Sequence, residues 1–291
     1  MILHKQNRRN TLRQPSAGLW WLFAFYLKWY FPRHFHAVRI ANSERLQGLG
    51  GPQTVYLNHA SWWDPLTCML LARHFFAEKT HFAPMDAEAL ERYKMLGKMG
   101  MFPVERGTRR GAEQFLRASA EVLSSERAML WLTPQGAFSD VRQRPLAFRP
   151  GLAGLLGRNP EVTAVPLAIE YTFWNERLPE ILIQVGLPLR FGPGVSTAAI
   201  EGSLVSALVS TQDGLASLAI ARNADAFNTV LSGSAGVGFA YDIWRRTLAM
   251  VQGKTYQEEH TAVAQSFIGE TDRKGDTLPI KTLEEGSLDR R

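Results

Sequence analysis

The stretch that decides the fold spans residues 54–65 and reads TVYLNHASWWDP. Residues 54–57 are β-branched, aromatic or aliphatic, and such a run predicts a short buried strand. Pro65 is typical of the first turn of a helix, where the amide hydrogen that proline lacks would have no partner. The sequence therefore predicts a strand, a turn and a helix in succession, with His59 and Asp64 at the two ends of the turn.

The spacing of His59 and Asp64 restricts how their side chains can meet. On one regular helix, residues five apart lie about 140° apart around the axis and cannot touch. They can meet if His59 ends the strand and Asp64 caps the helix that follows. The carboxylate would then hold one imidazole nitrogen, and the other nitrogen could remove a proton from an alcohol. The pair is therefore a candidate general base with its orienting acid.

A second pair, His81 and Asp86, has the same spacing, so the spacing alone is weak evidence. Pro84 separates a predicted strand at residues 80–82 from a helix for which Asp86 is a suitable N-cap. We therefore expect His81 and Asp86 to have a structural role.

Short apolar runs alternate with helical patterns through the middle of the chain. The runs that predict strands are residues 54–57, 80–82, 101–104, 128–132, 162–171 and 180–187. Helices are expected at residues 65–76, 86–95 and 112–124, the last of them capped by Thr108. This alternation predicts an α/β fold in which a central, mostly parallel or mixed sheet is flanked by helices.

Composition divides the chain into four segments. A basic, aromatic segment at residues 1–45 precedes a catalytic domain at 46–195. A helical extension of two or three helices is expected at 196–251, and a polar, partly flexible tail at 252–291. The chain has one cysteine, which excludes an internal disulfide and a thiolate zinc site. The seven histidines show no ligand spacing beyond positions 34 and 36, so we expect no metal.

The positive charge of the chain is concentrated at its front end. The whole sequence has 33 Lys and Arg against 27 Asp and Glu, a net charge of +6. Residues 1–50 hold eight basic groups and one acidic group, which is +7, so the other 241 residues carry −1. Only the front end therefore favours an anionic partner.

Residues 16–31 (SAGLWWLFAFYLKWYF) contain eight aromatic side chains between Pro15 and Pro32. As a helix this segment would extend about 24 Å, which is short of the roughly 30 Å hydrocarbon core of a bilayer. Tryptophan and tyrosine prefer the headgroup region, and the flanking cations attract anionic lipids. We expect an interfacial helix that holds the protein peripherally on the cytoplasmic face of a membrane. The alternative is an amphipathic helix packed on the domain's own core.

A secretory signal and a nucleic-acid-binding segment both fit the front end less well. A secretory signal needs small residues after its apolar stretch, but residues 31–40 (FPRHFHAVRI) are bulky and basic. Proteins that bind single-stranded nucleic acid space their aromatics among cations, whereas the aromatics here are contiguous. Since the sequence also has no nucleic-acid-binding motif, we expect no nucleic-acid partner.

The blocks that begin at His59 resemble the glycerolipid acyltransferase family, whose best-known members acylate lysophosphatidic acid. The first block of that family, Asn-His followed by four residues and Asp, is matched at residues 58–64. Later blocks are similar to FPVER (102–106), LTPQGAFS (132–139), FRPG (148–151) and AVPLAI (164–169). Blocks in the right order over residues 54–171 form a strong joint signal, although each is weak by itself.

The resemblance implies an O-acyltransferase of phospholipid biosynthesis. It would move a fatty acyl group from acyl-CoA or acyl carrier protein to a hydroxyl of a lysophospholipid or related lipid. His59 would take the proton from that hydroxyl, Asp64 would orient His59, and neither a cofactor nor a covalent acyl-enzyme is implied, in agreement with the lack of a Gly-x-Ser-x-Gly motif. The substrate-binding residues implied in the same way are Asn58, Arg106, Arg109, Gln135, Gly136, Phe138 and Arg149.

The third block departs from the family pattern. Gln135 replaces a glutamate, and Ala137 and Phe138 replace a Thr-Arg pair; in the family that glutamate and arginine usually hold the glycerol phosphate of the acceptor. A phenyl ring cannot grip a phosphate as a guanidinium does, so an acceptor without phosphate, such as a glycolipid or a pigment alcohol, stays open. Arg106, with Arg109 and Arg110 at a helix start, could instead form an anion site. A second basic group, Arg142, Arg144 and Arg149, follows the third block closely and is either part of such a site or an ordinary basic loop. A lipid-binding protein without activity and a hydrolase that activates water are further alternatives.

Overall fold

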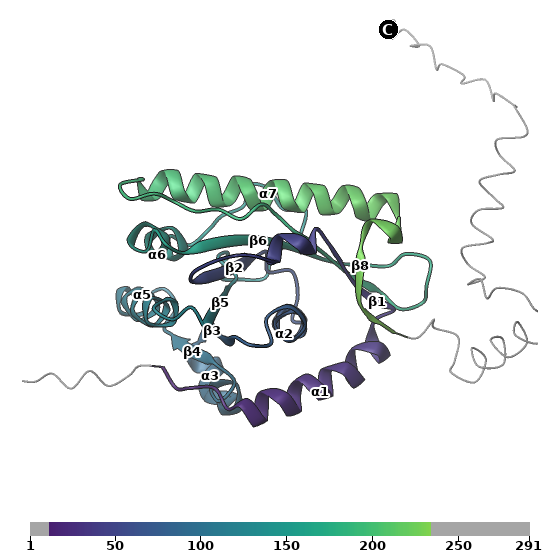
Figure 1. Ribbon diagram of the computed structural model, residues 1–291, viewed down its shortest axis with the longest axis horizontal. Helices are drawn as coiled ribbons and strands as arrows, with labels where there is room; N and C mark the ends of the chain where they lie inside the picture. The colour runs from purple at the N-terminus through teal and green to yellow at the C-terminus, as the bar shows by residue number, and fades with distance from the viewer. Residues whose placement is uncertain (1–11, 234–291) are drawn as a thin grey trace, which may run out of the picture. The chain divides into compact units, whose positions relative to one another are not determined.

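The computed structural model describes residues 12–233 of the chain. They form an eight-stranded sheet with the strand order β4-β3-β5-β2-β6-β7-β1-β8 (Figure 1). The strands are β1 (Ala37–Ala41), β2 (Gln53–Leu57), β3 (Thr80–Asp86), β4 (Met101–Val104), β5 (Ala128–Leu132), β6 (Thr163–Thr172), β7 (Glu180–Val185) and β8 (Asn228–Ser232). Neighbouring strands are parallel except in the pairs β6–β7 and β1–β8. The predicted α/β fold with a mostly parallel sheet is confirmed.

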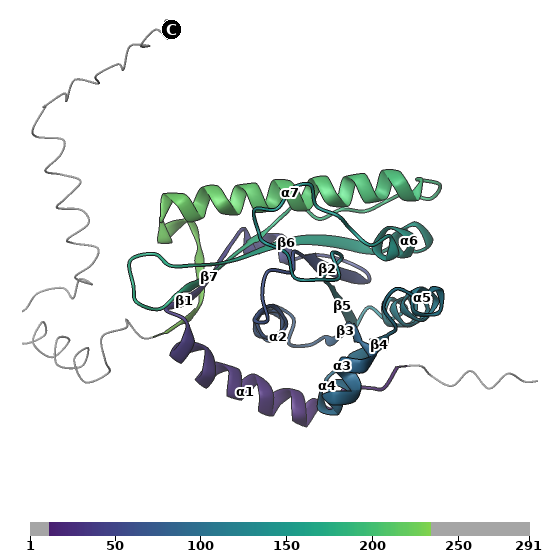
Figure 2. The same ribbon diagram turned by 180° about the vertical axis from the view of Figure 1, so that it is seen from behind.

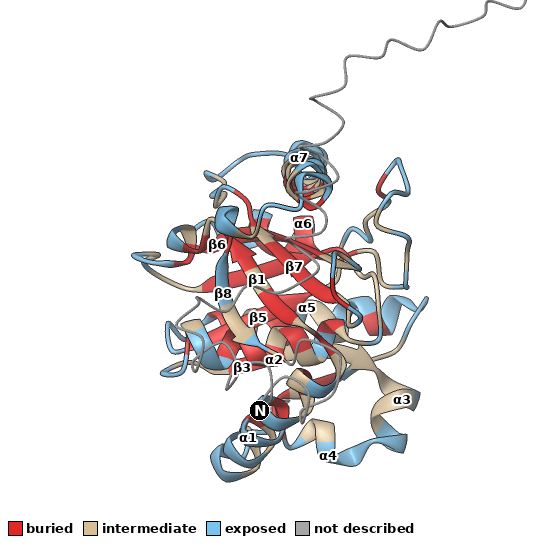
Figure 3. Cartoon of the chain, turned by 90° about the vertical axis from the view of Figure 1, so that its right-hand side faces the viewer, coloured by how far each residue is buried: buried red, intermediate tan, exposed pale blue. Residues whose placement is uncertain are grey.

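Helices cover both faces of the sheet. They are α1 (Ala17–His34), α2 (Asp64–Phe75), α3 (Ala87–Arg92), α4 (Lys94–Gly97), α5 (Arg109–Leu123), α6 (Gly151–Arg158) and α7 (Thr197–Ala221), with short 3₁₀ helices η1 (Ser43–Leu46) and η2 (Ala224–Ala226). The opposite views in Figures 1 and 2 place α1 and α2 on one face and α6 and α7 on the other. Figure 3 shows the strands as a buried layer between them.

Successive side chains of β2 point to opposite faces of the sheet and so pack in two different hydrophobic clusters. Val55 and Leu57 belong to the cluster that includes residues of α1 and α2. Tyr56 points to the other face, where its hydroxyl donates a hydrogen bond to the carbonyl of Leu204 on α7 at 3.1 Å. Because both faces are covered, every residue of β2 is buried, which explains why neighbouring residues of the run 55–57 are all largely apolar and do not alternate with polar ones.

The pair His81 and Asp86 is structural, as the sequence predicts. His81 Nε2 lies 3.0 Å from the Phe76 carbonyl, and the Trp131 indole donates to His81 Nδ1 at 3.2 Å. Burial lowers the pKa of His81 to about 4. The Asp86 side chain accepts hydrogen bonds from two backbone amides at the start of α3 and so caps that helix.

The sheet includes strands that lie before and after residues 46–195, the segment predicted from the sequence to form the catalytic domain. β1 precedes that segment and β8 follows it. The expectation of helices alone after residue 196 is wrong for β8, a short edge strand whose partner β1 lies some 190 residues earlier, a distance that local patterns cannot bridge. The rest of the predicted helical extension from residue 234, the tail at 252–291 and the first eleven residues lie outside the described part of the chain.

Of the helices within residues 12–233, α7 is the one that is long and apolar enough to cross a membrane. One side of α7 packs on the sheet, since Ile200, Leu204 and Leu208 are fully buried in the cluster with β2 and β5. The exposed positions include Ser203 and Asp213. The hydropathy of α7 is therefore explained by a helix that covers a sheet.

We predict that Leu204→Ala lowers the free energy of unfolding by about 2–5 kcal/mol, because it leaves a cavity under α7. Ile220→Ala on the same helix removes a side chain that is 82% exposed and should change stability by less than about 0.5 kcal/mol. Chemical unfolding measures both values. Equal effects would contradict the packing of α7 on the sheet.

Candidate active site

His59 lies at the carboxyl end of β2, close to the middle of the sheet. The strands on both sides of β2, β5 and β6, run parallel to it, so the loops that follow all three strands emerge at the same edge. In parallel α/β sheets this edge is where ligands commonly bind. The turn of residues 58–63 joins β2 to α2 and carries the predicted pair to this edge.

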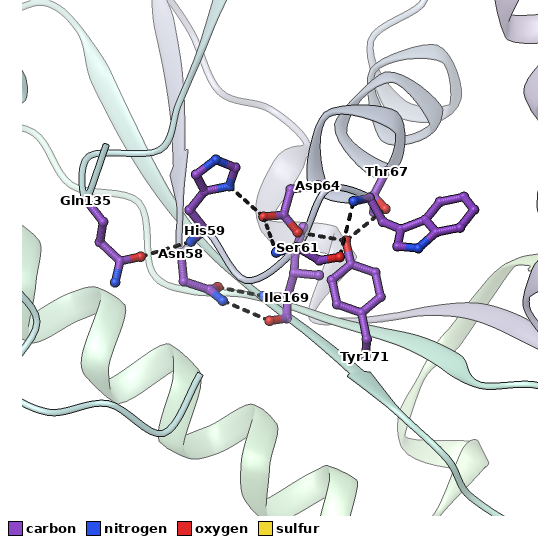
Figure 4. Close-up of polar contacts among 9 residues, drawn as sticks. Asn58, His59, Ser61, Asp64, Thr67, Gln135, Ile169 and Tyr171 are labelled. Carbon is purple, nitrogen blue, oxygen red and sulfur yellow. Dashed lines mark hydrogen bonds and ion pairs between the residues drawn. The ribbon is translucent and has the colours of Figure 1, made fainter. Parts of the chain in front are cut away.

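Asp64 is the buried centre of the site (Figure 4). Its side chain is 1% exposed and accepts hydrogen bonds at both oxygens. Oδ2 lies 2.7 Å from His59 Nδ1 and accepts from the Ser61 backbone amide at 3.0 Å, and Oδ1 accepts from the Tyr171 hydroxyl at 2.7 Å. The expected cap role of Asp64 is wrong: it is the first residue of α2, and its carboxylate turns back to the loop.

The His59 ring is oriented for proton transfer at its outer nitrogen. Nδ1 faces the Asp64 carboxylate, an acceptor, so Nδ1 carries the hydrogen and Nε2 is the basic nitrogen. Nε2 has no hydrogen-bond partner among residues 12–233, and the side chain is 17% exposed. A hydroxyl that approaches from outside can therefore reach it.

The loop after β5 holds the backbone of His59 on both sides. The Gln135 side-chain oxygen accepts from the His59 amide at 2.9 Å, and the Ser139 amide donates to the His59 carbonyl at 2.8 Å. Between these two contacts, the ring of Phe138 lies 4.4 Å from the His59 ring, measured between centroids, and is 61% exposed. Gln135 therefore holds the backbone of His59 in place, and Phe138 forms an apolar wall beside the His59 ring.

Gly136 allows Arg149 to approach this loop. Its φ of +68° is in the left-handed region, and a Cβ at this position would collide with Arg149 Nε. The Arg149 amide also donates to the Pro134 carbonyl at 2.9 Å. Among the described residues the Arg149 guanidinium has no acidic partner, which makes it a candidate for binding an anionic group.

Comparison of the sequence with protein-family models identifies the domain that holds this site. Residues 37–170 match the family model described as Acyltransferase. The chain carries an acyltransferase domain. The resemblance of the sequence blocks is therefore confirmed. The domain match runs from β1 through most of β6 and includes the predicted site residues.

Among solved structures, the chain is similar to the crystal structure of the 1-acyl-sn-glycerophosphate (LPA) acyltransferase PlsC from Thermotoga maritima. The two share 15% sequence identity with a TM-score of 0.47, over 68% of this chain and 79% of that one. No curated protein matches the sequence.

Asn58 of the acyltransferase domain is a brace between strands, not a substrate-binding residue. Its side-chain amide donates to the Ile169 carbonyl, and its side-chain oxygen accepts from the Ile169 amide, both at 2.9 Å. Asn58 is 1% exposed, and both of its polar side-chain groups are used by β6. The residue next to His59 thus joins the end of β2 to β6.

Arg106 and Arg109 do not reach His59. They follow β4, which is separated from β2 by β3 and β5. Arg106 forms an ion pair with Asp86 at 3.1 Å, and Arg109 pairs with Glu113 at 3.1 Å on the exposed surface of α5. The structure therefore does not bring these two arginines to the candidate site as expected. They form local ion pairs away from His59.

Tyr171 is the site residue that the sequence blocks missed. It lies near the end of β6, one position beyond the acyltransferase match, and its hydroxyl is also 3.4 Å from Thr67 Oγ1 on α2. The sequence offers one signal for Tyr171: it is an aromatic residue with a hydroxyl near the carboxyl end of a strand that is predicted for a mostly parallel sheet, and ligands commonly bind at that edge. Within residues 12–233 no group of three or more His, Cys, Asp or Glu side chains is placed to hold a metal.

We predict that Asn58→Ala lowers the free energy of unfolding by about 1–3 kcal/mol, because it leaves the buried Ile169 backbone groups without partners. Asn175→Ala removes an exposed hydrogen bond to Arg222 and is the control, with an expected loss below about 0.5 kcal/mol. Urea unfolding monitored by circular dichroism compares the two variants. A loss no larger than the control's would contradict the brace.

Proposed function

We propose that this acyltransferase moves a fatty acyl group from a thioester to a hydroxyl of a lysophospholipid, with His59 as the general base. The observation that carries the proposal is the 2.7 Å contact between His59 Nδ1 and the buried Asp64 carboxylate, which leaves Nε2 available. An imidazole held in one tautomer by a carboxylate is suited to removing a proton from an alcohol.

The reaction would proceed as a direct transfer. His59 Nε2 accepts the proton of the acceptor hydroxyl while its oxygen attacks the thioester carbonyl carbon. The tetrahedral adduct then expels the thiolate as the carbon–sulfur bond breaks, and the imidazolium returns its proton to the sulfur. The enzyme contributes mainly the positioned base and the proximity of two bound substrates. Acyl-CoA and acyl carrier protein both present such a thioester, and no cofactor takes part.

Two features of the site bear on the acceptor. The Arg149 guanidinium beside Gly136 is suited to the phosphate of a lysophospholipid such as 1-acylglycerol 3-phosphate. The Phe138 ring against His59 favours a second candidate, a lipid alcohol without phosphate. A pair of acceptors with the same acyl chain, one phosphorylated and one neutral, separates the two candidates.

Helix α1 supports a location on a membrane surface. Its buried residues Ala24, Leu27 and Phe31 face the core, so the helix is packed on the domain as the alternative interpretation expects. Its opposite side nevertheless exposes Trp21, Phe25 and Trp29 by 52–64%. Figure 3 shows this exposed outer side along α1. A helix that is fixed to the domain and has an aromatic outer face can lie in the headgroup region while the site stays at its surface.

Trp62 links this outer face to the active-site loop. Its side chain is 64% exposed, and its ring contacts that of Trp63, which packs on Tyr30 and Phe35 at the end of α1. We infer that α1 and Trp62 meet the same lipid surface, which would deliver a membrane-borne acceptor near His59. The proposed location is the cytoplasmic face, where acyl-CoA and acyl carrier protein are present.

For the reaction, we predict that His59→Ala lowers the rate of acyl transfer by roughly 10²–10⁴-fold. Asp64→Asn should lower it by at least roughly 100-fold, because the tautomer of His59 is no longer enforced. The measurement is labelled lipid formed from labelled acyl thioester with each of the two matched acceptors. Full activity of a folded His59→Ala variant would exclude the proposed base. Liposome binding without any acyl transfer by the wild type would indicate a lipid-binding protein.

For the membrane surface, we predict that replacing Trp21, Phe25 and Trp29 together by Ser weakens binding to anionic liposomes by about 10–100-fold, through loss of buried aromatic area. The three side chains are exposed, so the fold should persist. Ile220→Ser, which removes an even more exposed apolar side chain on α7, is the control and should bind as the wild type does. Unchanged binding by the triple variant in a flotation assay would contradict the role of α1.

A further inference from the structure

The oxygen of Asp64 that does not face His59 is held by the hydroxyl of Tyr171. The distance is 2.7 Å, and because a carboxylate only accepts, the tyrosine is the donor (Figure 4). With its proton used in this way, the Tyr171 oxygen can accept from Thr67 Oγ1, 3.4 Å away. Thr67, Tyr171, Asp64 and His59 thus form one chain of hydrogen bonds from α2 through β6 to the proposed base.

Packing fixes the Tyr171 ring in this position. The ring lies 6.1 Å from that of Phe35, which also packs edge-on against Trp63 at 4.7 Å. Trp63 immediately precedes Asp64 in the chain. The end of α1 therefore supports both the residue that bonds Asp64 and the residue next to it.

We propose that Tyr171 is a positioning residue that sets the proton affinity of His59 through Asp64. The inference rests on the proposed function, since it assigns Tyr171 to the same acyl transfer. Tyr171 is partly buried behind Asp64, and its hydroxyl contacts the Asp64 oxygen that does not face His59, so it acts through the carboxylate and not on the substrate.

The expected direction follows from the charge on Asp64. The Tyr171 hydroxyl stabilises the carboxylate, and it does so most when His59 is neutral and offers no positive charge. Removal of the hydroxyl therefore destabilises the pair with neutral His59 more than the pair with protonated His59. His59 should then take up its proton at a higher pH, and less of it should be available as a base at a given pH.

Other titratable groups near this chain of hydrogen bonds do not account for such a change. Burial, and then the neighbouring Asp64, raise the pKa of both Tyr171 and Cys68 well above their usual ranges, so both stay protonated at working pH. His34 of α1 packs on Trp63, and Glu170 precedes Tyr171 on β6 with its pKa raised by burial. Cys68, His34 and Glu170 are the same in wild type and Tyr171→Phe, so their effects on His59 cancel in the comparison.

The test is Tyr171→Phe in the full-length protein, with Tyr56→Phe as the matched control. Tyr56 is a second tyrosine with a hydrogen-bonded hydroxyl; it is fully buried, and its hydroxyl points to α7 on the other face of the sheet. We expect Tyr171→Phe to lower kcat roughly tenfold with KM unchanged, and to move the acidic limb of the kcat/KM profile upward by about 0.5–1 pH unit. The control should leave the profile in place.

A second readout does not depend on activity. Nuclear magnetic resonance of histidine-labelled protein follows the His59 ring, identified by the signal that His59→Gln removes. Its titration should move upward in Tyr171→Phe and not in Tyr56→Phe. Coincident His59 titrations in wild type and Tyr171→Phe would overturn the proposal, whether or not the enzyme assay succeeds. If the His59 titration shifts in Tyr171→Phe but the wild type transfers no acyl group, the result would support the chain of hydrogen bonds. It would contradict the proposed function instead.

If Tyr171→Phe does not fold, Thr67→Val replaces it. This change keeps the shape of the side chain and removes the hydroxyl that contacts Tyr171. Weaker donation by Tyr171 should then move the His59 titration in the same direction by a smaller amount. The absence of any shift in Thr67→Val would contradict the proposed chain of hydrogen bonds.

Discussion

The site depends on a carboxylate that is almost completely removed from water. A buried charge is costly unless polar groups replace its hydration, and for Asp64 the donors His59, Ser61 and Tyr171 do so. These donors come from the end of β2, from the following turn and from the end of β6. Asp64 can accept from all three donors only when β2 and β6 are paired in the observed register. The position of the His59 ring therefore depends on the pairing of these two strands.

The same register explains the neighbouring contacts. Asn58 bonds both backbone groups of Ile169, which places Tyr171, two residues further along β6, on the side of the sheet where Asp64 lies. The loop after β5 adds the third support through Gln135. An amide oxygen at position 135 accepts from the His59 backbone as a carboxylate would, which gives the glutamine a structural role of its own. In the proposed function, the residues that bear on the acceptor are therefore Phe138 and Arg149.

Much of the fold and the contact between His59 and Asp64 could be predicted from sequence because the signals are local. Apolar runs predict six of the eight described strands, and burial on both faces keeps these runs nearly continuous in β2, β5, β6 and β7. The two strands that were not predicted are β8, a short and mostly exposed edge strand, and its five-residue neighbour β1, whose partners β7 and β8 lie far away in the sequence. His59 and Asp64 are separated by one turn, so their spacing predicts the pair. Tyr171 and the Asn58 brace depend on contacts more than 100 residues apart, which no local spacing reveals.

The most direct test of the account is a single turnover of labelled acyl thioester with excess enzyme and a lipid extract, in which protein, lipid and free fatty acid are separated over time. Direct transfer from thioester to a hydroxyl activated by His59 predicts that label passes to a lipid ester without first accumulating on the protein or as fatty acid. Label that appears first as an acyl-protein would show a covalent route, and label that appears as free fatty acid at the rate of thioester loss would show a hydrolase; either result would contradict the account.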